Sequence, residues 1–263
     1  MTILHQLADY ARMRVAKDKD KVSLEEIREI ASQAKANQHT DFIFEQTLRK
    51  KDLGFICECK KASPSKGLIE PNFAYLKIAQ EYEVAGADCI SVLTEPKWFL
   101  GSDQYLQEIA NTVSVPCLRK DFTVDEYQIY QGKVLGATAV LLICSILTQR
   151  QLEQYMGICE ELGLSALIEV HDEDEANIAV KSGARIIGVN NRNLKDFTVD
   201  TDNSRRLRDL IPSDVLYVSE SGVKTAQDIA KLREIGANAV LIGETLMRAS
   251  DKKAKLNELK SSL

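Results

Sequence analysis

The sequence lacks the features that mark membrane, secreted and nucleic-acid-binding proteins. No window holds the ~18 consecutive apolar residues of a membrane helix, and the N-terminal segment has no apolar run long enough for a signal peptide. Six cysteines among 263 residues are too few for a disulfide scaffold. Lys and Arg number 34 against 39 Asp and Glu, so there is no basic excess to attract nucleic acid. We expect a soluble, cytoplasmic protein with reduced cysteines and neither a membrane nor a nucleic-acid partner.

Eight short apolar or β-branched segments recur along the chain, and amphipathic stretches lie between them. The segments are Phe55–Lys60, Cys89–Leu93, Pro116–Lys120, Ala139–Cys144, Ser165–Val170, Arg185–Asn190, Val215–Ser219 and Ala239–Gly243. The helical spacing of the intervening stretches is visible in Leu152, Tyr155 and Cys159. Strands of about five residues that alternate with helices indicate βα units and a parallel sheet.

A Gly-Ala pair precedes every second strand. The pairs begin at Gly86, Gly136, Gly183 and Gly236, so their spacings are 50, 47 and 53 residues. Glycine at this point supplies the left-handed residue that ends a helix. Each interval holds two βα units, which gives the eight strands of a (β/α)8 TIM barrel; an open doubly wound sheet is the alternative. No Pro/Gly/Ser-rich linker interrupts the chain, so we expect residues 1–263 to form a single α/β domain.

The first 54 residues stand outside this repeat. Apolar residues from Leu4 to Val15 recur at helical spacing, and Ser23 with Glu26 matches the capping box that begins a second helix. Residues 1–54 are therefore predicted to form an N-terminal helical extension. It either plugs one end of the barrel or covers the active-site end, and the sequence favours neither.

Charged residues interrupt the first predicted strand. Because side chains alternate between the two faces of a strand, Glu58 and Lys60 share the inward face with Ile56. Catalytic groups of such barrels sit at the C-terminal ends of the strands, and burying charges without a purpose is costly. The pair is thus a candidate for catalysis, the alternative being an inert ion pair. Cys57 and Cys59 face the helices and are predicted to pack there rather than to bind a metal.

Four further strands end in polar residues on their inward faces. These are Lys120 on the third strand, Glu169 on the fifth, Asn190 on the sixth and Glu220 on the seventh. Lys120 is a candidate general acid and Glu169 a candidate general base, although each alone could be a solvated rim residue. Because buried charges are rare, their convergence indicates acid/base chemistry on an anionic substrate. His171 precedes residues that can cap the next helix, which favours a loop position for it.

A phosphate site is predicted beside the last two strands. The loops after strands seven and eight of such barrels commonly bind phosphate. Gly222 and Gly243 stand in these loops, and Glu244 begins a short helical segment. Glycine lets backbone N–H groups approach an anion, and a helix N-terminus favours negative charge. At Glu244 the donor must be the backbone N–H, since the side chain is a carboxylate.

Six segments of the chain match one known family in order. They are Glu58–Gly67, Leu118–Phe122, Glu169–His171, Gly188–Leu194, Ser219–Gly222 and Val240–Glu244. The first resembles the E-x-K-x-x-S-P-S-K-G segment of indole-3-glycerol phosphate synthases, and the others resemble that family too. The resemblance covers nearly the whole chain, including the N-terminal extension. The main departures, at Cys57, Cys59 and Trp98, leave the charged positions untouched.

The resemblance implies a reaction. Its family converts 1-(2-carboxyphenylamino)-1-deoxyribulose 5-phosphate to indole-3-glycerol phosphate in tryptophan synthesis, with loss of carbon dioxide and water and without a cofactor or metal. It implies Lys120 as the proton donor to the substrate ketone and Lys60 as the partner of the substrate carboxylate. Glu169 would remove a proton during rearomatisation or dehydration. The expected partner is this small molecule, and the expected oligomeric state is a monomer.

The resemblance also implies roles for other residues at the barrel mouth. Glu58, Asn190 and Glu220 would orient the lysines and the substrate hydroxyls. The phosphate side would consist of Ser63, Arg192, Ser221, Gly222, Gly243 and Glu244. The wall beside the aromatic ring would consist of Phe122, Leu142 and Leu194.

Two rival functions stay open at this point. A related barrel such as phosphoribosylanthranilate isomerase would use a Cys and an Asp as its acid/base pair, but Cys59 is predicted to point outward. A non-catalytic phosphate-binding barrel would need the glycine loops but not Lys60, Lys120 and Glu169. Assays for indole formation and for isomerase activity separate these functions.

Overall fold

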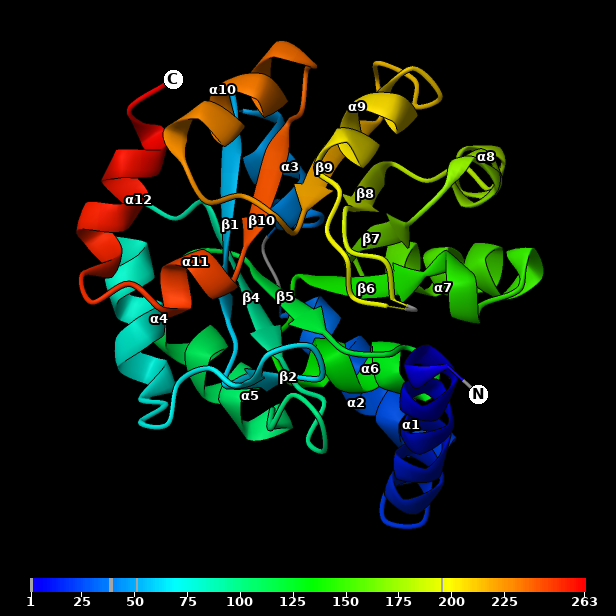
Figure 1. Cartoon of the computed structure of the whole chain (residues 1–263). Helices are drawn as coiled ribbons and strands as arrows, with labels where there is room; N and C mark the ends of the chain where they lie inside the picture. Colours follow the sequence, from blue (N-terminus) through cyan, green and yellow to red (C-terminus); the bar gives the residue numbers. More distant parts are fainter. Residues whose placement is uncertain (1, 38–39, 51, 195) are drawn as a thin grey trace.

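The computed structural model describes residues 2–37, 40–50, 52–194 and 196–263, and its centre is a closed barrel of parallel strands (Figure 1). The barrel strands are β1 (Gly54–Cys59), β4 (Cys89–Leu93), β5 (Cys117–Lys120), β6 (Ala139–Ile143), β7 (Ser165–Val170), β8 (Ile186–Asn190), β9 (Leu216–Glu220) and β10 (Ala239–Ile242). They pair in chain order, and β1 closes the ring by pairing with both β10 and β4. The predicted (β/α)8 barrel is confirmed, and the open sheet is wrong.

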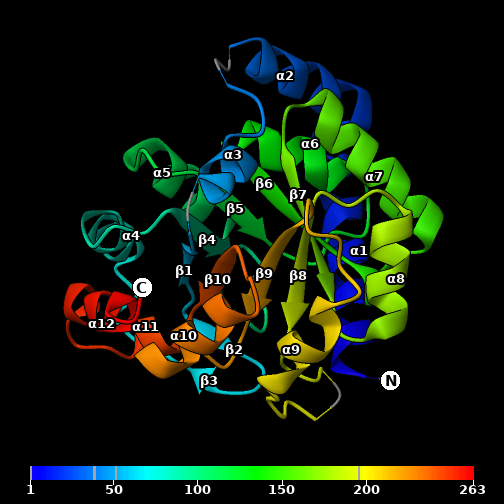
Figure 2. The ribbon, with the colours of Figure 1, turned by 90° about the horizontal axis from the view of Figure 1, so that it is seen from above.

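Helices surround the barrel (Figure 2). They are α4 (Tyr75–Val84), α5 (Asp103–Thr112), α6 (Tyr127–Val134), α7 (Gln149–Glu161), α8 (Glu173–Lys181), α9 (Asp202–Arg208), α10 (Ala226–Glu234) and α12 (Lys252–Lys260), with the short α11 (Glu244–Met247) and the 3-10 turn η1 (Cys144–Ile146). The glycines of the four Gly-Ala pairs all have positive φ, between 73° and 86°, as expected for residues that end helices. None of the helices described is long and apolar enough to cross a membrane.

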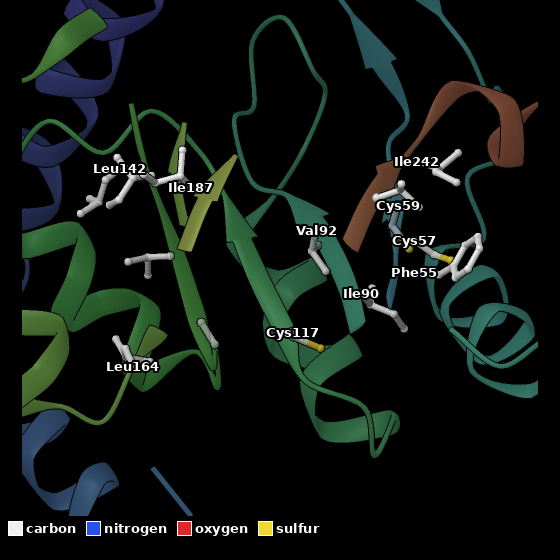
Figure 3. Packing of buried hydrophobic residues seen from close by; sticks show 14 of the residues in the cluster. Phe55, Cys57, Cys59, Ile90, Val92, Cys117, Leu142, Leu164, Ile187 and Ile242 are labelled. Atoms are coloured by element: carbon white, nitrogen blue, oxygen red, sulfur yellow. The ribbon is translucent and has the colours of Figure 1, made fainter. Parts of the chain in front are cut away.

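The strand side chains divide into two apolar clusters. The outer cluster lies between strands and helices and contains Phe55, Cys57 and Cys59 (Figure 3). The inner cluster fills the barrel and contains Ile56 and Leu118. The predicted alternation of the first strand is therefore confirmed, and both cysteines are buried and unbonded to one another. In the part of the chain that the structure describes, no three His, Cys, Asp or Glu side chains are grouped to hold a metal ion.

Helices of the N-terminal extension lie at both ends of the barrel. It consists of α1 (Ile3–Lys19), α2 (Leu24–Ala36) and α3 (Ile43–Arg49). Leu4 and Leu7 of α1 belong to the inner cluster and reach the C-terminal end of the barrel, whereas Phe44 and Leu48 of α3 fill the N-terminal end. Ser23 caps α2 by accepting a hydrogen bond from the Glu26 N–H, but the return bond to the Glu26 side chain that would complete the predicted capping box is not formed. The sequence left open whether the extension plugs one end of the barrel or covers the other. In the structure α3 plugs the N-terminal end and α1 lies over the C-terminal end.

A short hairpin that the sequence did not suggest follows β1. Its strands are β2 (Ala62–Ser63) and β3 (Gly67–Leu68), which pair antiparallel. Figure 2 shows the hairpin and α3 at opposite ends of the barrel. The hairpin therefore brings Ser63 and Lys66 to the C-terminal end, where the polar strand residues also lie.

Candidate active site

The C-terminal ends of the strands surround a cavity of about 660 Å³. Among the residues that line it are Glu58, Lys60, Ser63, Lys120, Phe122, Glu169, Asn190, Arg192, Leu194, Glu220, Ser221, Gly222, Gly243 and Glu244. Every predicted site residue except Leu142 is in this set. The parallel strands explain the result, because their C-terminal ends all meet at one end of the barrel.

Lys120 lies between two carboxylates at the floor of the cavity. Its Nζ is 3.1 Å from Glu169 Oε2 and 3.7 Å from Glu220 Oε2. Both carboxylates are 2% exposed. The amide of Asn190 donates to Glu169 Oε1 at 3.2 Å, and its oxygen accepts from the Ser221 hydroxyl at 2.9 Å. The inward ends of β5, β7, β8 and β9 therefore form one connected polar cluster.

The charges of this cluster stabilise one another. Burial by itself would lower the pKa of Lys120, but the nearby carboxylates, above all Glu169 and Glu220, raise it above its ordinary value. Burial opposes ionisation of Glu169 as well, yet the positive charge of Lys120 holds the pKa of Glu169 well below its usual range. At neutral pH the pair is an ammonium and a carboxylate, which are the forms that a proton donor and a proton acceptor require.

Glu220 behaves differently from Glu169. Burial raises its pKa to about 8, because the attraction of Lys120 does not offset desolvation and the repulsion of Glu169. Its Oε1 is buried and accepts no hydrogen bond from any residue that the structure describes. A Cβ at Gly188 would collide with this oxygen, so glycine in β8 leaves the room that Glu220 needs. At neutral pH a protonated Glu220 is able to donate a hydrogen bond into the cavity.

The Glu58 carboxylate and the Lys60 ammonium form the second charged pair of the site. They come from the end of β1 and are in direct contact, with the side chains 5% and 17% exposed. Gly243 faces them, and a Cβ there would collide with Glu58 Oε1 and stand 2.8 Å from Lys60 Nζ. Glycine at position 243 therefore leaves room for the Glu58–Lys60 pair. This is separate from its predicted role, which is to let the backbone approach an anion.

The loops after β9 and β10 form the cationic end of the cavity. Ser221 and Gly222 both have positive φ, 68° and 94°, so the chain turns sharply there. Glu244 directs its carboxylate to Arg248 Nε at 3.1 Å and to Lys66 Nζ at 3.5 Å. Because two cations share one carboxylate, positive charge remains to face the cavity.

Arg192 adds a further cation to this end. It lines the cavity, and its guanidinium donates to the Phe197 carbonyl at 3.1 Å. Its backbone N–H donates to Asn190 Oδ1 at 3.0 Å. The same amide oxygen also accepts from Ser221, so Asn190 links the cationic end to Glu169.

Apolar side chains form the opposite wall. Phe122 and Leu194 lie there as predicted, but Leu142 does not: it belongs to the outer cluster, under the helices (Figure 3). Ala139 pairs with inward Leu118, and paired residues of parallel strands share a face, so the odd-numbered residues of β6 point inward. Leu141 and Ile143 therefore replace Leu142 in the wall.

Other parts of the wall were missed by the sequence reasoning. They are Leu4 and Leu7 of α1 and Phe99 of the loop after β4. The ring centroids of Phe99 and Phe122 are 6.0 Å apart. The apolar stripe of α1 was visible in the sequence, but nothing in it told which end of the barrel the helix covers.

His171 contacts a residue of the active site, although its sequence position predicted only a loop residue. Asp172 caps α8 as predicted, with its Oδ1 3.0 Å from the Glu175 N–H, and His171 lies in the loop before that helix. Its ring nevertheless approaches the site, with Nε2 3.3 Å from Glu169 Oε1. The sequence signal for this contact was the even spacing of Glu169 and His171, which would place both side chains on one face of a strand, but the helix-capping residues that follow favoured a loop position.

Comparisons with known proteins identify the family of the chain. A family model for indole-3-glycerol phosphate synthase matches residues 4–259. The indole-3-glycerol phosphate synthase of Ruminiclostridium cellulolyticum is 55% identical over 260 residues, which is 99% of each chain. The enzyme of that name from Lachnoclostridium phytofermentans is 47% identical over 270 residues, covering 99% of this chain and 100% of the relative.

Solved structures of other proteins share the fold. The 3-hexulose-6-phosphate synthase of Salmonella typhimurium superposes with a TM-score of 0.66 at 12% identity, covering 80% of this chain and 98% of that one. At this identity the likeness supports the barrel alone. The sequence matches extend over nearly the entire length of both partners. The chain therefore belongs to the indole-3-glycerol phosphate synthase family.

Proposed function

We propose that this protein carries out the reaction of its family, the conversion of 1-(2-carboxyphenylamino)-1-deoxyribulose 5-phosphate to indole-3-glycerol phosphate (EC 4.1.1.48), in tryptophan biosynthesis. The observation that carries the proposal is the position of Lys120 between Glu169 and Glu220, on the floor of a cavity with one apolar wall and one cationic end. The substrate has an aromatic ring, a ketone and a phosphate, and each of these parts meets a matching surface.

The two ends of the cavity orient the substrate. The phosphate lies at the cationic end, against the backbone of Gly222 and Gly243 and the side chains of Ser63, Ser221 and Arg192, with the Glu244 N–H as a further donor. The aromatic ring lies against Phe122, Leu194 and their apolar neighbours. Such placement holds the ring carbon next to the ketone carbon, which converts ring closure into a reaction between prepositioned groups.

Lys120 supplies the proton for ring closure. The ring carbon that bears the carboxylate attacks the ketone carbon, and the ketone oxygen takes a proton from the Lys120 ammonium. Lys60 binds the substrate carboxylate beside the ring and is held in place by Glu58. Loss of carbon dioxide then restores the aromatic ring, so the protein's part in this step is chiefly to position the groups.

Glu169 serves as the base for the loss of water. The new hydroxyl leaves as water with a proton from the Lys60 ammonium, the methylene group next to nitrogen gives up a proton to form the ring double bond, and the Glu169 carboxylate accepts that proton. Asn190 orients the carboxylate through its amide. Glu220, protonated at neutral pH and with one unbonded oxygen, binds a substrate hydroxyl.

The proposal extends to the domain organisation, oligomeric state, location and cofactor requirement of the protein. Residues 1–263 act as one catalytic domain that includes the extension 1–54, and the protein works as a cytoplasmic monomer without metal, cofactor or nucleic acid. None of the described residues that line the cavity is a cysteine, and Cys59 lies in the outer cluster, which disfavours the Cys/Asp pair that an isomerase would need. A binding protein alone would not need charged groups as deeply buried as Glu169 and Glu220.

An assay of the purified protein tests the proposed function. The carboxyphenylamino substrate is supplied, and formation of the indole product is followed by its fluorescence. Phosphoribosylanthranilate is offered in parallel to detect isomerase activity. We expect indole formation alone, with Lys120→Ala as the inactive control. Isomerase activity, or tight substrate binding without turnover, would contradict the proposal.

A further inference from the structure

His171 lies behind Glu169, outside the ring of residues that line the cavity. Its side chain is 15% exposed and stands between two carboxylates. Nε2 is 3.3 Å from Glu169 Oε1, and Nδ1 is 3.0 Å from Glu175 Oε2. The imidazole therefore bridges the base in the cavity and an acidic residue on α8.

Neighbouring elements hold the ring in this position. The backbone N–H of His171 donates to Glu175 Oε2 at 2.8 Å, and the amide of Asn203 on α9 donates to the His171 carbonyl at 3.1 Å. The Ser145 hydroxyl, in η1, is 3.3 Å from Nδ1 and also bonds the Glu175 carboxylate. Ser145 and Asn203 are neutral, so the carboxylates of β7 and α8 are the charges that contact the ring.

Other charged groups lie one step further away. Lys120 and Glu220 stand on the far side of Glu169, and the exposed Asp172 caps α8 next to His171. Burial alone would lower the pKa of His171, but the two contacting carboxylates raise it to about 10. At neutral pH the ring is thus an imidazolium.

The proposed reaction creates a need for this charge. Lys120 is the cation nearest to the Glu169 carboxylate, at 3.1 Å, and it becomes neutral when its proton goes to the ketone oxygen. With no other cation beside it, the buried Glu169 would then capture a proton and cease to be a base. His171 Nε2, on the other carboxylate oxygen, forms no hydrogen bond of good geometry with any described residue, so its contact with Glu169 is ionic.

We propose that His171 is a positioning residue for Glu169. It supplies a second, permanent positive charge beside this carboxylate, so that Glu169 stays ionised after Lys120 has given up its proton. Glu175 keeps His171 protonated, and Ser145 fixes the orientation of both. The inference rests on the proposed function, since it takes Lys120 as the acid and Glu169 as the base.

The first test is the pH dependence of kcat, which reports the ionisation of groups in the substrate complex, for wild type, His171→Gln and His5→Gln between pH 4 and 9. An opposite charge at this distance shifts a carboxyl pKa by about one unit or more. We expect the acid-side midpoint of His171→Gln to lie about one unit above that of wild type, with about a tenfold loss below the midpoint and near-complete recovery at high pH. His5 is exposed on α1, and His5→Gln should match wild type.

The outcome separates this proposal from a purely structural role. A structural defect would lower activity equally at all pH values, and an unmoved midpoint would overturn the proposal while leaving the proposed function intact. Absence of turnover in wild type would instead remove the proposed function, and this inference with it.

A second measurement does not depend on how the His171 variant folds. Nitrogen NMR of the wild-type protein should show both ring nitrogens of His171 protonated at pH 7.5. Glu175→Gln should lower the titration midpoint of His171, whereas Glu173→Gln, an exposed neighbour on the same helix, should leave it unchanged. A neutral His171 ring in wild type at pH 7.5 would overturn the proposal.

Discussion

The ammonium group of Lys120, at the end of β5, lies 3.1 Å from the carboxylate of Glu169, at the end of β7. Because β6 separates their strands, the contact depends on both side chains pointing into the barrel. Each group shifts the pKa of the other toward its charged form. The pair is therefore ready to give and take protons only when a substrate separates the two groups.

Replacing the two lysines should affect different kinetic constants. Lys120→Ala is expected to lower kcat by about 10²–10⁴-fold, because a proton donor acts in the transition state. Lys60→Ala is expected to raise KM more, because a group that binds the substrate carboxylate also stabilises the ground state. Steady-state kinetics of indole formation measure both. Near wild-type kcat in Lys120→Ala would show that this lysine is not the acid.

Glu169→Gln tests the base directly. The substitution keeps the size of the side chain but removes its ability to accept a proton. We expect normal folding, substrate affinity close to wild type, and a loss of turnover of about 10²–10⁴-fold. Calorimetric binding and single-turnover rates give the two quantities separately. Lost binding with intact turnover per bound substrate would leave Glu169 a structural residue.

Much of this site was predictable because polar residues mark the inward face of a strand. Glu58 in β1 and Lys60 just after it break an apolar run, and the period of two then assigns every neighbour correctly. In β6, all residues from Ala139 to Ile143 are apolar and buried, so nothing in the run itself distinguishes the two faces. Leu142 was misassigned for that reason. The pairing of Ala139 with Leu118 of β5 shows which residues of β6 point inward. That pairing exists only in the folded barrel and cannot be read from the β6 segment alone.

The contact of His171 with Glu169 was missed for a different reason. The positions of Asp172 and Glu175 identify the start of α8, and the structure has that helix where they predict it. The direction of the His171 ring, however, depends on Ser145 and on Glu175 from separate elements. Local sequence describes the turn but not what packs against it.

Replacing Glu220 by glutamine should change how stability depends on pH. In the folded protein the pKa of Glu220 is raised from 4.5 to about 8, so the folded state keeps a proton that the unfolded state releases above pH ~4.5. Wild type should therefore lose stability relative to Glu220→Gln as the pH rises from 5 to 8. Urea unfolding at both pH values measures this difference. If the difference in unfolding free energy between wild type and Glu220→Gln is the same at pH 5 and pH 8, Glu220 is ionised in the folded state.

Two Gly→Ala substitutions should have opposite effects. A Cβ at Gly243 would collide with Glu58, so Gly243→Ala should displace the Glu58–Lys60 pair and lower kcat/KM by about 10²-fold. A Cβ at Gly157, in the middle of α7, meets no atom within 4 Å. Gly157→Ala should keep full activity and stabilise the helix by about 0.5–1 kcal/mol. Equal activity of both variants would show that the site adapts to a methyl group at Gly243.

An ion pair between Arg14 and Asp121 holds α1 over the cavity. Arg14 forms two hydrogen bonds to the Asp121 carboxylate, at 2.6 and 3.0 Å, and Asp121 directly follows Lys120. The Asp121 side chain is 1% exposed, so Arg14→Ala would leave a buried carboxylate without this partner. We expect a loss of stability of about 3 kcal/mol. This is at the lower end for a broken buried ion pair, because the Thr94 hydroxyl still donates to Asp121.

Arg14→Ala should also raise KM, because Leu4 and Leu7 of the same helix line the cavity. The matched control is Arg12→Ala on the same helix, whose pair with Asp9 is 56% exposed on both sides and contributes less than about 1 kcal/mol. Urea unfolding and steady-state kinetics compare the two variants. If Arg14→Ala keeps the KM of Arg12→Ala despite its lower stability, α1 covers the cavity without help from this ion pair.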